Sequence, residues 1–139
     1  MAEIILAEAE KAVGLAMMLK DLLEQNLQRH PEKIKDFEAL DNSIAITAPD
    51  IDVSVTLLFE KGRLTIYNGI VDQPAIMITA NSDMLLELNL LNIKFGMPWY
   101  FDERGRKVIK LIFSGQLKIK GMFLHLPTLT RLTKIMSVF

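Results

Sequence analysis

Cysteine is absent from this sequence, and other patterns are scarce enough to exclude whole classes of protein. Without cysteine there are no disulfides, no thiolate catalysis and no cysteine-based zinc site. No stretch approaches the roughly 18 consecutive apolar residues that a membrane-spanning helix requires. No glycine-rich phosphate loop is present, because Gly115 and Gly121 lack a following Lys-Ser/Thr pair.

Candidate catalytic residues are equally few. Of the two histidines, His30 follows a predicted helix, where an imidazolium suits the negative end of the helix dipole. His125 stands between two leucines and either faces a cavity or, as we prefer, is a hydrogen-bonded structural residue. Neither has a carboxylate three or four residues away that would orient it as a base or complete a metal pair. We therefore expect no enzymatic activity, no metal and no cofactor.

What the sequence has in excess is hydrophobic side chains. Its 139 residues fit one domain, half of them are hydrophobic, and the mean hydropathy is +0.26. The surplus must be buried in the core, shared with a partner or turned toward a ligand. Eight methionines favour the ligand, since this flexible side chain adapts to varied shapes.

The spacing of apolar residues predicts helices separated by strands. Helices are expected over 3–29 (an N-terminal helix within 1–30), 32–39, 82–91 and 122–137, where Pro127 marks a fresh first turn or a kink. Alternation predicts strands over 44–47, 51–60, 63–67, 75–80 and 116–120, with a tight turn at Lys61-Gly62. Residues 107–113 fit either a helix or a strand. The order predicts an α+β fold with one antiparallel sheet and helices on its dry face.

Charge is divided unevenly along the chain. Residues 1–103 hold all 17 acidic residues and eight basic ones, whereas residues 104–139 hold eight basic residues and no acid. A cluster of Arg104, Arg106, Lys107 and Lys110 begins the basic part. These cations are neutralised either by the acidic part of the chain or by an external anion such as an anionic membrane. Nucleic acid is not expected, because the cations alternate with Leu and Ile and stacking aromatics are few.

Residues 113–132, FSGQLKIKGMFLHLPTLTRL, resemble the C-terminal signature of the sterol carrier protein family of non-specific lipid-transfer domains. The signature has an aromatic residue, Ser-Gly-x-Leu, an alternating Lys-Ile-Lys strand, a glycine and a leucine-rich helix. The hairpin VTLLFEKGRLTIYNG and the segment PAIMITANSDMLLEL are also similar to that family. The resemblance implies one domain over 1–139, most specific at 113–135. Its sheet of about five strands is backed by helices and encloses a tunnel for fatty acids, acyl-CoA, sterols or isoprenoids.

Together with the surplus of apolar helix positions, the resemblance predicts which side chains line the cavity. They are Met84, Leu88, Phe113, Met122, Leu126 and Leu129. The alternative for each of them is ordinary core packing. The run Trp99, Tyr100 and Phe101, beside a glycine and a proline, forms either a lip at the entrance or a plug in the core.

The expected function is therefore non-catalytic binding or transfer of an apolar lipid. The alternative is an accessory or scaffold protein whose apolar surface binds a protein partner or a second copy, for example in isoprenoid-quinone biosynthesis. A cytoplasmic location is expected, because the acidic start at Glu3, Glu8 and Glu10 is unlike a secretory signal. The end of the chain, Ser137-Val138-Phe139, is not a peroxisomal address.

Overall fold

The fold was described from a computed structural model, which defines residues 3–7, 14–71, 73–88, 93–94, 97–98 and 101–138; of these, 86–88, 93–94 and 97–98 are described by their backbone alone. Its helices are α1 (Gly14–Arg29), α2 (Ile34–Ala39), α3 (Ser82–Leu88), α4 (Glu103–Phe113) and α5 (Leu126–Met136). Its strands are β1 (Glu3–Leu6), β2 (Ser43–Ala48), β3 (Val53–Phe59), β4 (Arg63–Asn68), β5 (Ile76–Thr79), β6 (Ile93–Lys94), β7 (Met97–Pro98) and β8 (Lys118–Lys120). Short 3-10 helices occupy Pro31–Lys33 and Pro49–Ile51.

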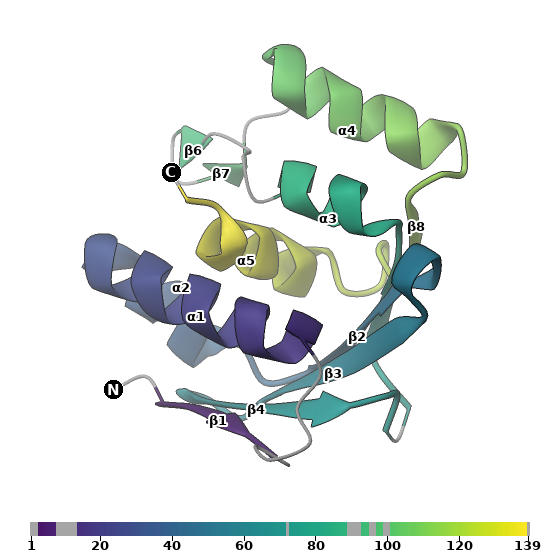
Figure 1. Ribbon diagram of the computed structural model, residues 1–139. Coiled ribbons are helices and arrows are strands. Elements are labelled where there is room, and N and C mark those ends of the chain that lie inside the picture. Colours follow the sequence, from purple (N-terminus) through teal and green to yellow (C-terminus); the bar gives the residue numbers. More distant parts are fainter. Residues whose placement is uncertain are drawn as a thin grey trace.

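The main sheet has six strands in the order β1-β4-β3-β2-β5-β8, and the helices lie on one of its faces (Figure 1). The α+β class and the single layer of helices agree with the expectation from sequence. The purely antiparallel, five-stranded sheet was wrong, because β1 pairs parallel with β4, and β2 pairs parallel with β5. The chain must cross β3 and β2 between β4 and β5, and this crossover makes the second of these pairs parallel.

The N-terminal segment differs most from the sequence prediction. A helix over 3–29 was expected, whereas Glu3–Leu6 is an edge strand and the helix begins at Gly14 within the described residues. Two consecutive isoleucines, Ile4 and Ile5, favour a strand, since β-branched side chains fit a pleated surface. Pairing with β4 sets Ile4 beside Leu64 on the inner face and leaves Ile5 on the outer face. A tertiary contact therefore decided the local structure.

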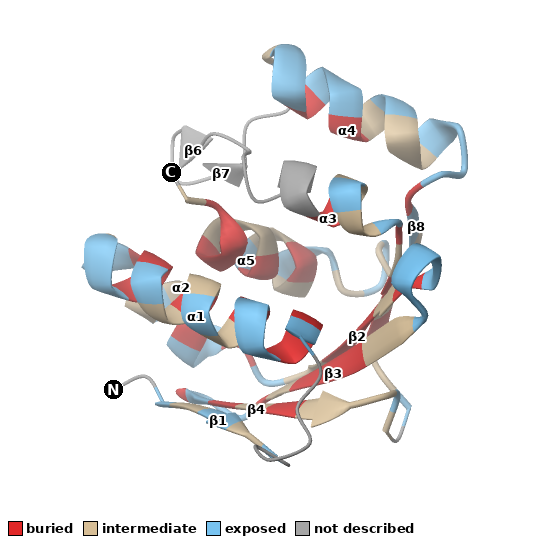
Figure 2. Ribbon diagram, in the orientation of Figure 1, coloured by how far each residue is buried: buried red, intermediate tan, exposed pale blue. Residues whose placement is uncertain are grey.

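The inner face of the sheet and the facing sides of the helices form the hydrophobic core (Figure 2). Val55, Leu57 and Phe59 alternate inward along β3 and are almost completely buried. Phe59 meets Phe37 of α2 edge to face, with ring centres 5.8 Å apart. This contact fixes α2 against the sheet.

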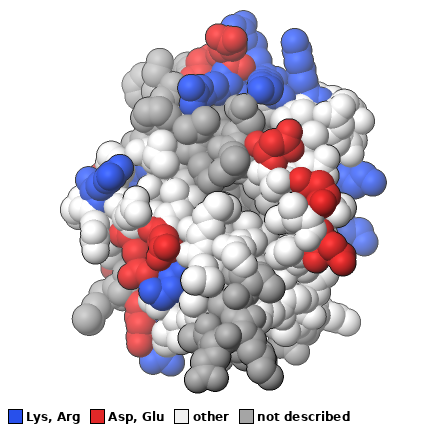
Figure 3. Space-filling view, in the orientation of Figure 1, with Lys and Arg blue, Asp and Glu red and all other residues white. Residues whose placement is uncertain are grey.

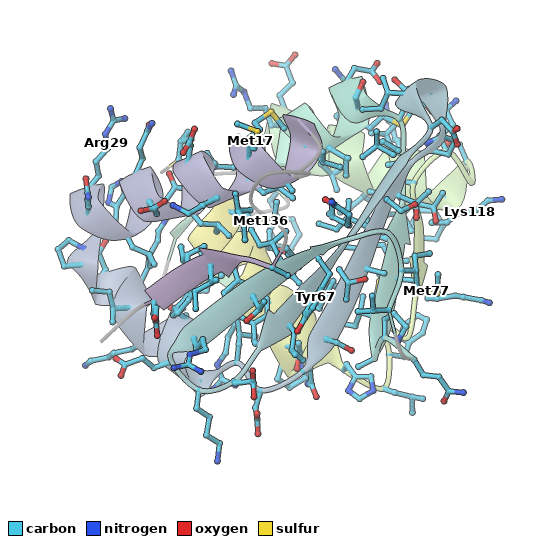
Figure 4. All side chains as sticks on the ribbon, turned by 60° about the horizontal axis from the view of Figure 1, so that its bottom comes forward. Met17, Arg29, Tyr67, Met77, Lys118 and Met136 are labelled. Atoms are coloured by element: carbon cyan, nitrogen blue, oxygen red, sulfur yellow. The ribbon has the colours of Figure 1, made fainter. Side chains whose placement is uncertain are left out.

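The opposite face of the sheet carries mostly smaller and more polar side chains. Tyr67 and Met77 are larger side chains on the same face (Figure 4). Thr56 lies on this face yet is fully buried, because the crossover after β4 covers it. Its hydroxyl donates to the Gly69 carbonyl oxygen at 2.8 Å and accepts from the Val71 amide at 3.1 Å. One threonine thus ties the crossover to the middle of the sheet.

The end of α5 is held by side chains from the first 33 residues. Asn26 Nδ2 donates to the Ile135 carbonyl oxygen at 2.9 Å, and Lys33 Nζ donates to that of Ser137 at 2.7 Å. Lys33 is only 3% exposed, and burial lowers the pKa of its ammonium group below 10.5, an effect opposed by the nearby Glu32 and Asp36 carboxylates. The cation therefore lies at the negative end of the helix, at the cost of its hydration.

Two glycines at similar backbone angles have different surroundings. Gly115 (φ +79°) has no atom near the position that a Cβ would take, whereas a Cβ on Gly121 (φ +81°) would lie 2.2 Å from the Ala75 carbonyl oxygen. Gly121 follows β8 directly, so this close approach sets β8 against the beginning of β5. Only glycine allows the approach.

We expect Gly121→Ala to lower the free energy of unfolding by about 3 kcal/mol, since it combines left-handed strain with a backbone overlap. Gly115→Ala is the matched control and should lose about 1 kcal/mol, the cost of the left-handed conformation alone. Urea unfolding measures both variants. Equal losses would show that the Gly121–Ala75 contact is unimportant.

Lys33→Met should destabilise the fold by about 2 kcal/mol, because it removes a charged donor from a buried carbonyl group. The exposed Lys35→Met is the matched control and should change stability by less than about 0.5 kcal/mol. The pKa of Lys33 is lowered in the folded state, so the unfolded chain binds the extra proton between that value and 10.5. The stability difference between wild type and Lys33→Met should therefore grow as pH rises through this window. A difference that shrinks with rising pH would contradict the assignment.

Candidate functional site: an apolar pocket between the sheet and three helices

A pocket of about 220 Å³ lies between the inner face of the sheet and helices α3, α4 and α5. Its lining residues are apolar except for one threonine; they are Ile46, Ile78, Leu85, Val108, Ile109, Ile112, Ile119, Met122, Leu126, Leu129, Leu132, Thr133 and Met136. The Thr133 hydroxyl donates to the Leu129 carbonyl oxygen of its own helix at 2.8 Å. The lining therefore suits a hydrocarbon ligand and has little capacity for polar recognition.

Burial separates the base of this pocket from its mouth. Ile46, Val108 and Leu132 are at most 2% exposed and belong to the base. Met136, at the end of α5, also points into the interior (Figure 4). Apart from Thr133, the partly exposed lining residues are Ile109 and Ile112 on α4, Ile119 on β8, Met122, and Leu126, which is 51% exposed. The mouth therefore lies between α4, β8 and the beginning of α5.

Three of the six residues expected from sequence line this pocket: Met122, Leu126 and Leu129. Met84 is partly buried and packs against the hydrophobic core, outside the lining. The side chain of Leu88 lies outside the described residues. Phe113 does not line the pocket and is 86% exposed.

Helical geometry explains the position of Phe113. Residues 107–113, left open between helix and strand, belong to α4. Val108, Ile109 and Ile112 share the face that lines the pocket. Phe113 is the last residue of α4 and is turned about 40° from Ile109 and about 100° from Ile112, so it lies at the outer edge of that face. The family signature places an aromatic residue here, but the helix turns it outward.

The sequence interpretation missed the lining residues of α4 and of the central strands. Val108, Ile109 and Ile112 recur at the helical spacing i, i+1 and i+4, with Arg106 and Lys107 before them and Lys110 between them. This amphipathic pattern was the available signal. Ile46 and Ile78 gave no such signal, because alternation marks a core strand and a pocket wall alike.

The basic cluster lies on the exposed face of α4. Arg104, Arg106, Lys107 and Lys110 are all exposed, and cationic side chains gather over this helix at the top of Figure 3. Lys134 instead pairs with Asp36 at 2.9 Å, with both side chains mostly buried. Lys134 is therefore neutralised within the chain, and the four basic residues of α4 are exposed to solvent.

The aromatic lip predicted at 99–101 falls mainly on residues that the structure does not describe, namely Trp99 and Tyr100. Phe101 is described and is 75% exposed, so it does not plug the core. It precedes Asp102, whose carboxylate caps α4 by accepting from the Gly105 amide at 2.8 Å.

Two polar side chains outside the pocket, those of His30 and Asp50, have structural partners. His30 Nε2 lies 3.2 Å from the Val138 carbonyl oxygen, and Asp50 accepts from the amide and hydroxyl of Ser82 at the beginning of α3. These bonds, led by that from the Ser82 hydroxyl, lower the pKa of Asp50. His125 is half-buried and precedes α5. In the described ranges, no three His, Asp or Glu side chains are grouped as metal ligands.

The fold of this chain is similar to the folds of several solved structures. The ubiquinone synthesis protein UbiJ-SCP2 superposes with a TM-score of 0.61 at 16% identity, covering 88% of this chain and 94% of that one. Sterol carrier protein 2 superposes with a TM-score of 0.52 at 15% identity, covering 85% of this chain and 90% of that one. This chain has the sterol carrier protein 2 fold.

A third structure supports the same fold. A conserved hypothetical protein from Thermus thermophilus, described as possibly a sterol carrier protein, superposes with a TM-score of 0.51 at 15% identity, covering 84% of this chain and 80% of that one. No family model and no curated protein matches the chain by sequence. None of the helices in the described ranges has both the length and the apolar character needed to cross a bilayer. The resemblance predicted from residues 113–132 is thus confirmed at the level of fold.

Proposed function

We propose that this protein binds the apolar part of a lipid in the pocket and carries it, without catalysis, through the cytoplasm. The observation that carries the proposal is an almost wholly apolar pocket with one open side, within a sterol carrier protein 2 fold. A ligand there is held by removal of hydrocarbon from water. Each buried methylene contributes about 0.8 kcal/mol.

The volume of the pocket narrows the choice of ligand. About 220 Å³ exceeds the roughly 150 Å³ cavity that binds benzene, and it is below the roughly 300 Å³ at which pockets for whole drug-sized ligands begin. One end of an acyl or isoprenoid chain suits this space, while a sterol would require α4 or α5 to move. A burial of about six methylenes contributes about 5 kcal/mol before immobilisation is subtracted.

A second candidate is an accessory role in isoprenoid-quinone synthesis. The similarity to the ubiquinone synthesis protein UbiJ-SCP2 favours it, since that superposition has the higher TM-score and covers nearly all of both chains. The same pocket would then hold an isoprenoid tail, and a protein partner would supply the chemistry. Organic extraction of the purified protein followed by lipid mass spectrometry distinguishes acyl from isoprenoid ligands, and an empty protein would count against both.

We expect Val108→Trp to weaken binding of the fluorescent fatty acid cis-parinaric acid at least about tenfold, because an indole at the base occupies the ligand space. Ile70→Trp is the matched control, since it adds the same ring to the crossover on the other face of the sheet. Fluorescence titration measures affinity, and thermal unfolding verifies that both variants fold. Unchanged binding by a folded Val108→Trp protein would overturn the pocket assignment.

A further inference from the structure

Two large apolar side chains beside the mouth of the pocket are almost fully exposed. Phe123 and Leu124 are each 86% exposed, and they lie between the lining residues Met122 and Leu126. Leu126 is itself 51% exposed. Covalent connection therefore places both exposed side chains at the rim, within two residues of a side chain that lines the pocket.

The backbone holds these side chains outward. The segment begins at Gly121, whose contact with Ala75 allows no side chain, and the His125 amide donates to the Gly121 carbonyl oxygen at 3.0 Å. The turn is therefore closed at both ends by backbone contacts. Exposure of two neighbouring large apolar residues in a constrained turn costs free energy in water, and such a patch marks an interaction surface.

Helix α4 borders the same mouth and adds positive charge. Arg106, Lys110 and Phe113 follow the spacing i, i+4 and i+7 and so share one exposed face, while Ile109 and Ile112 line the pocket. On β8, the alternation of side chains turns Lys118 away from the inner face, and it projects from the edge of the sheet (Figure 4). After Glu103, in the first turn of α4, the sequence contains no acidic residue.

We propose that the pocket rim, defined as Phe113, Phe123, Leu124 and Leu126 with the basic face of α4, docks on an anionic lipid bilayer. The apolar rim side chains enter the acyl region, while Arg106 and Lys110 contact lipid phosphates. The mouth then faces the bilayer, and an apolar ligand passes between the two without crossing water. This inference rests on the proposed function and names the source of the ligand.

The composition of the rim favours a bilayer over a protein partner. Lysine is depleted at the cores of protein interfaces, whereas an amphipathic helix with cations on its polar face, beside Phe and Leu, is typical of segments that lie at a membrane surface. Charge is complementary as well. Every charged residue after Glu103 is a cation, and the cytoplasmic surface of membranes is anionic.

The test is co-sedimentation with vesicles of equal parts phosphatidylcholine and phosphatidylglycerol, compared with vesicles of phosphatidylcholine alone. Wild type should bind the anionic vesicles more tightly, and binding should fall as salt is raised. The double variant Phe123→Ser, Leu124→Ser should bind about tenfold more weakly or worse, because two apolar insertions are lost. The matched control Met17→Ser, Met18→Ser removes two exposed apolar side chains from α1, which does not line the pocket, and should bind like wild type.

A second pair of changes tests the cations. Arg106→Gln with Lys110→Gln should weaken binding to anionic vesicles about fivefold for each charge removed and should leave binding to neutral vesicles unchanged. Circular dichroism verifies that each variant is folded.

Binding of cis-parinaric acid in vesicle-free solution separates docking from the pocket itself. The rim variants should still bind cis-parinaric acid. If the wild type itself does not bind cis-parinaric acid, the proposed function is contradicted, whatever the vesicle experiment shows. Docking is overturned if wild type binds neither vesicle, or if the rim and α1 variants bind equally. It is also overturned if the rim changes abolish only a dimer seen by size-exclusion chromatography, which would make the rim a contact between copies.

Discussion

The pocket depends on how the C-terminal end of α5 is held. Lys33 and Asn26 donate to the carbonyl groups of Ser137 and Ile135, and thereby join residues more than 100 positions apart in the chain. A helix C-terminus presents carbonyl groups without helical partners and a partial negative charge, so a buried ammonium group satisfies both. Helix α5 supplies more pocket-lining residues than any other element, and its position decides whether the space is a pocket or a filled core.

The surplus of apolar residues is divided between two uses. One part forms a core in which Phe37, Phe59 and Leu23 are almost completely buried. The other part surrounds a space that protein atoms leave unfilled, at the junction of three helices and the sheet. Close packing is the rule in protein interiors, and unfilled apolar space forfeits dispersion contacts. A ligand of matching chemistry restores those contacts, which is the physical link between this fold and lipid binding.

Helix α4 connects the interior of the protein to its surroundings. One face supplies Val108 and Ile112 to the pocket, while the exposed surface of the same helix carries the cations. Movement of this helix therefore changes the size of the pocket. An anion that binds the outer face of α4 contacts the same helix that lines the pocket. The proposed carrier needs such a coupling, because a ligand held only by burial must be uncovered to leave.

Sequence alone determined those features that depend on local chemistry. The hairpin turn at Lys61-Gly62 was predictable because a glycine at the second position favours a tight turn between strands. The structure agrees, since both residues adopt positive φ. Pro127 could open a fresh first turn because its missing amide needs no partner there, and the structure places it at the beginning of α5. The signature around Gly121 indicated the fold correctly. The close approach of Gly121 to the Ala75 carbonyl oxygen permits only glycine, so the sequence must carry a glycine at this position.

Only the tertiary structure decided the features that depend on distant partners. Glu3–Leu6 is a strand because β4 pairs with it, although its pattern also suits a helix. Phe113 is exposed because residues 107–113 form a helix that ends at this residue, at the outer edge of the face that lines the pocket. Ile46 and Ile78 border a pocket because α4 and α5 stop short of filling the space above them. A hydrophobic pattern specifies which side of an element is buried, but the packing of other elements decides whether protein or ligand covers it.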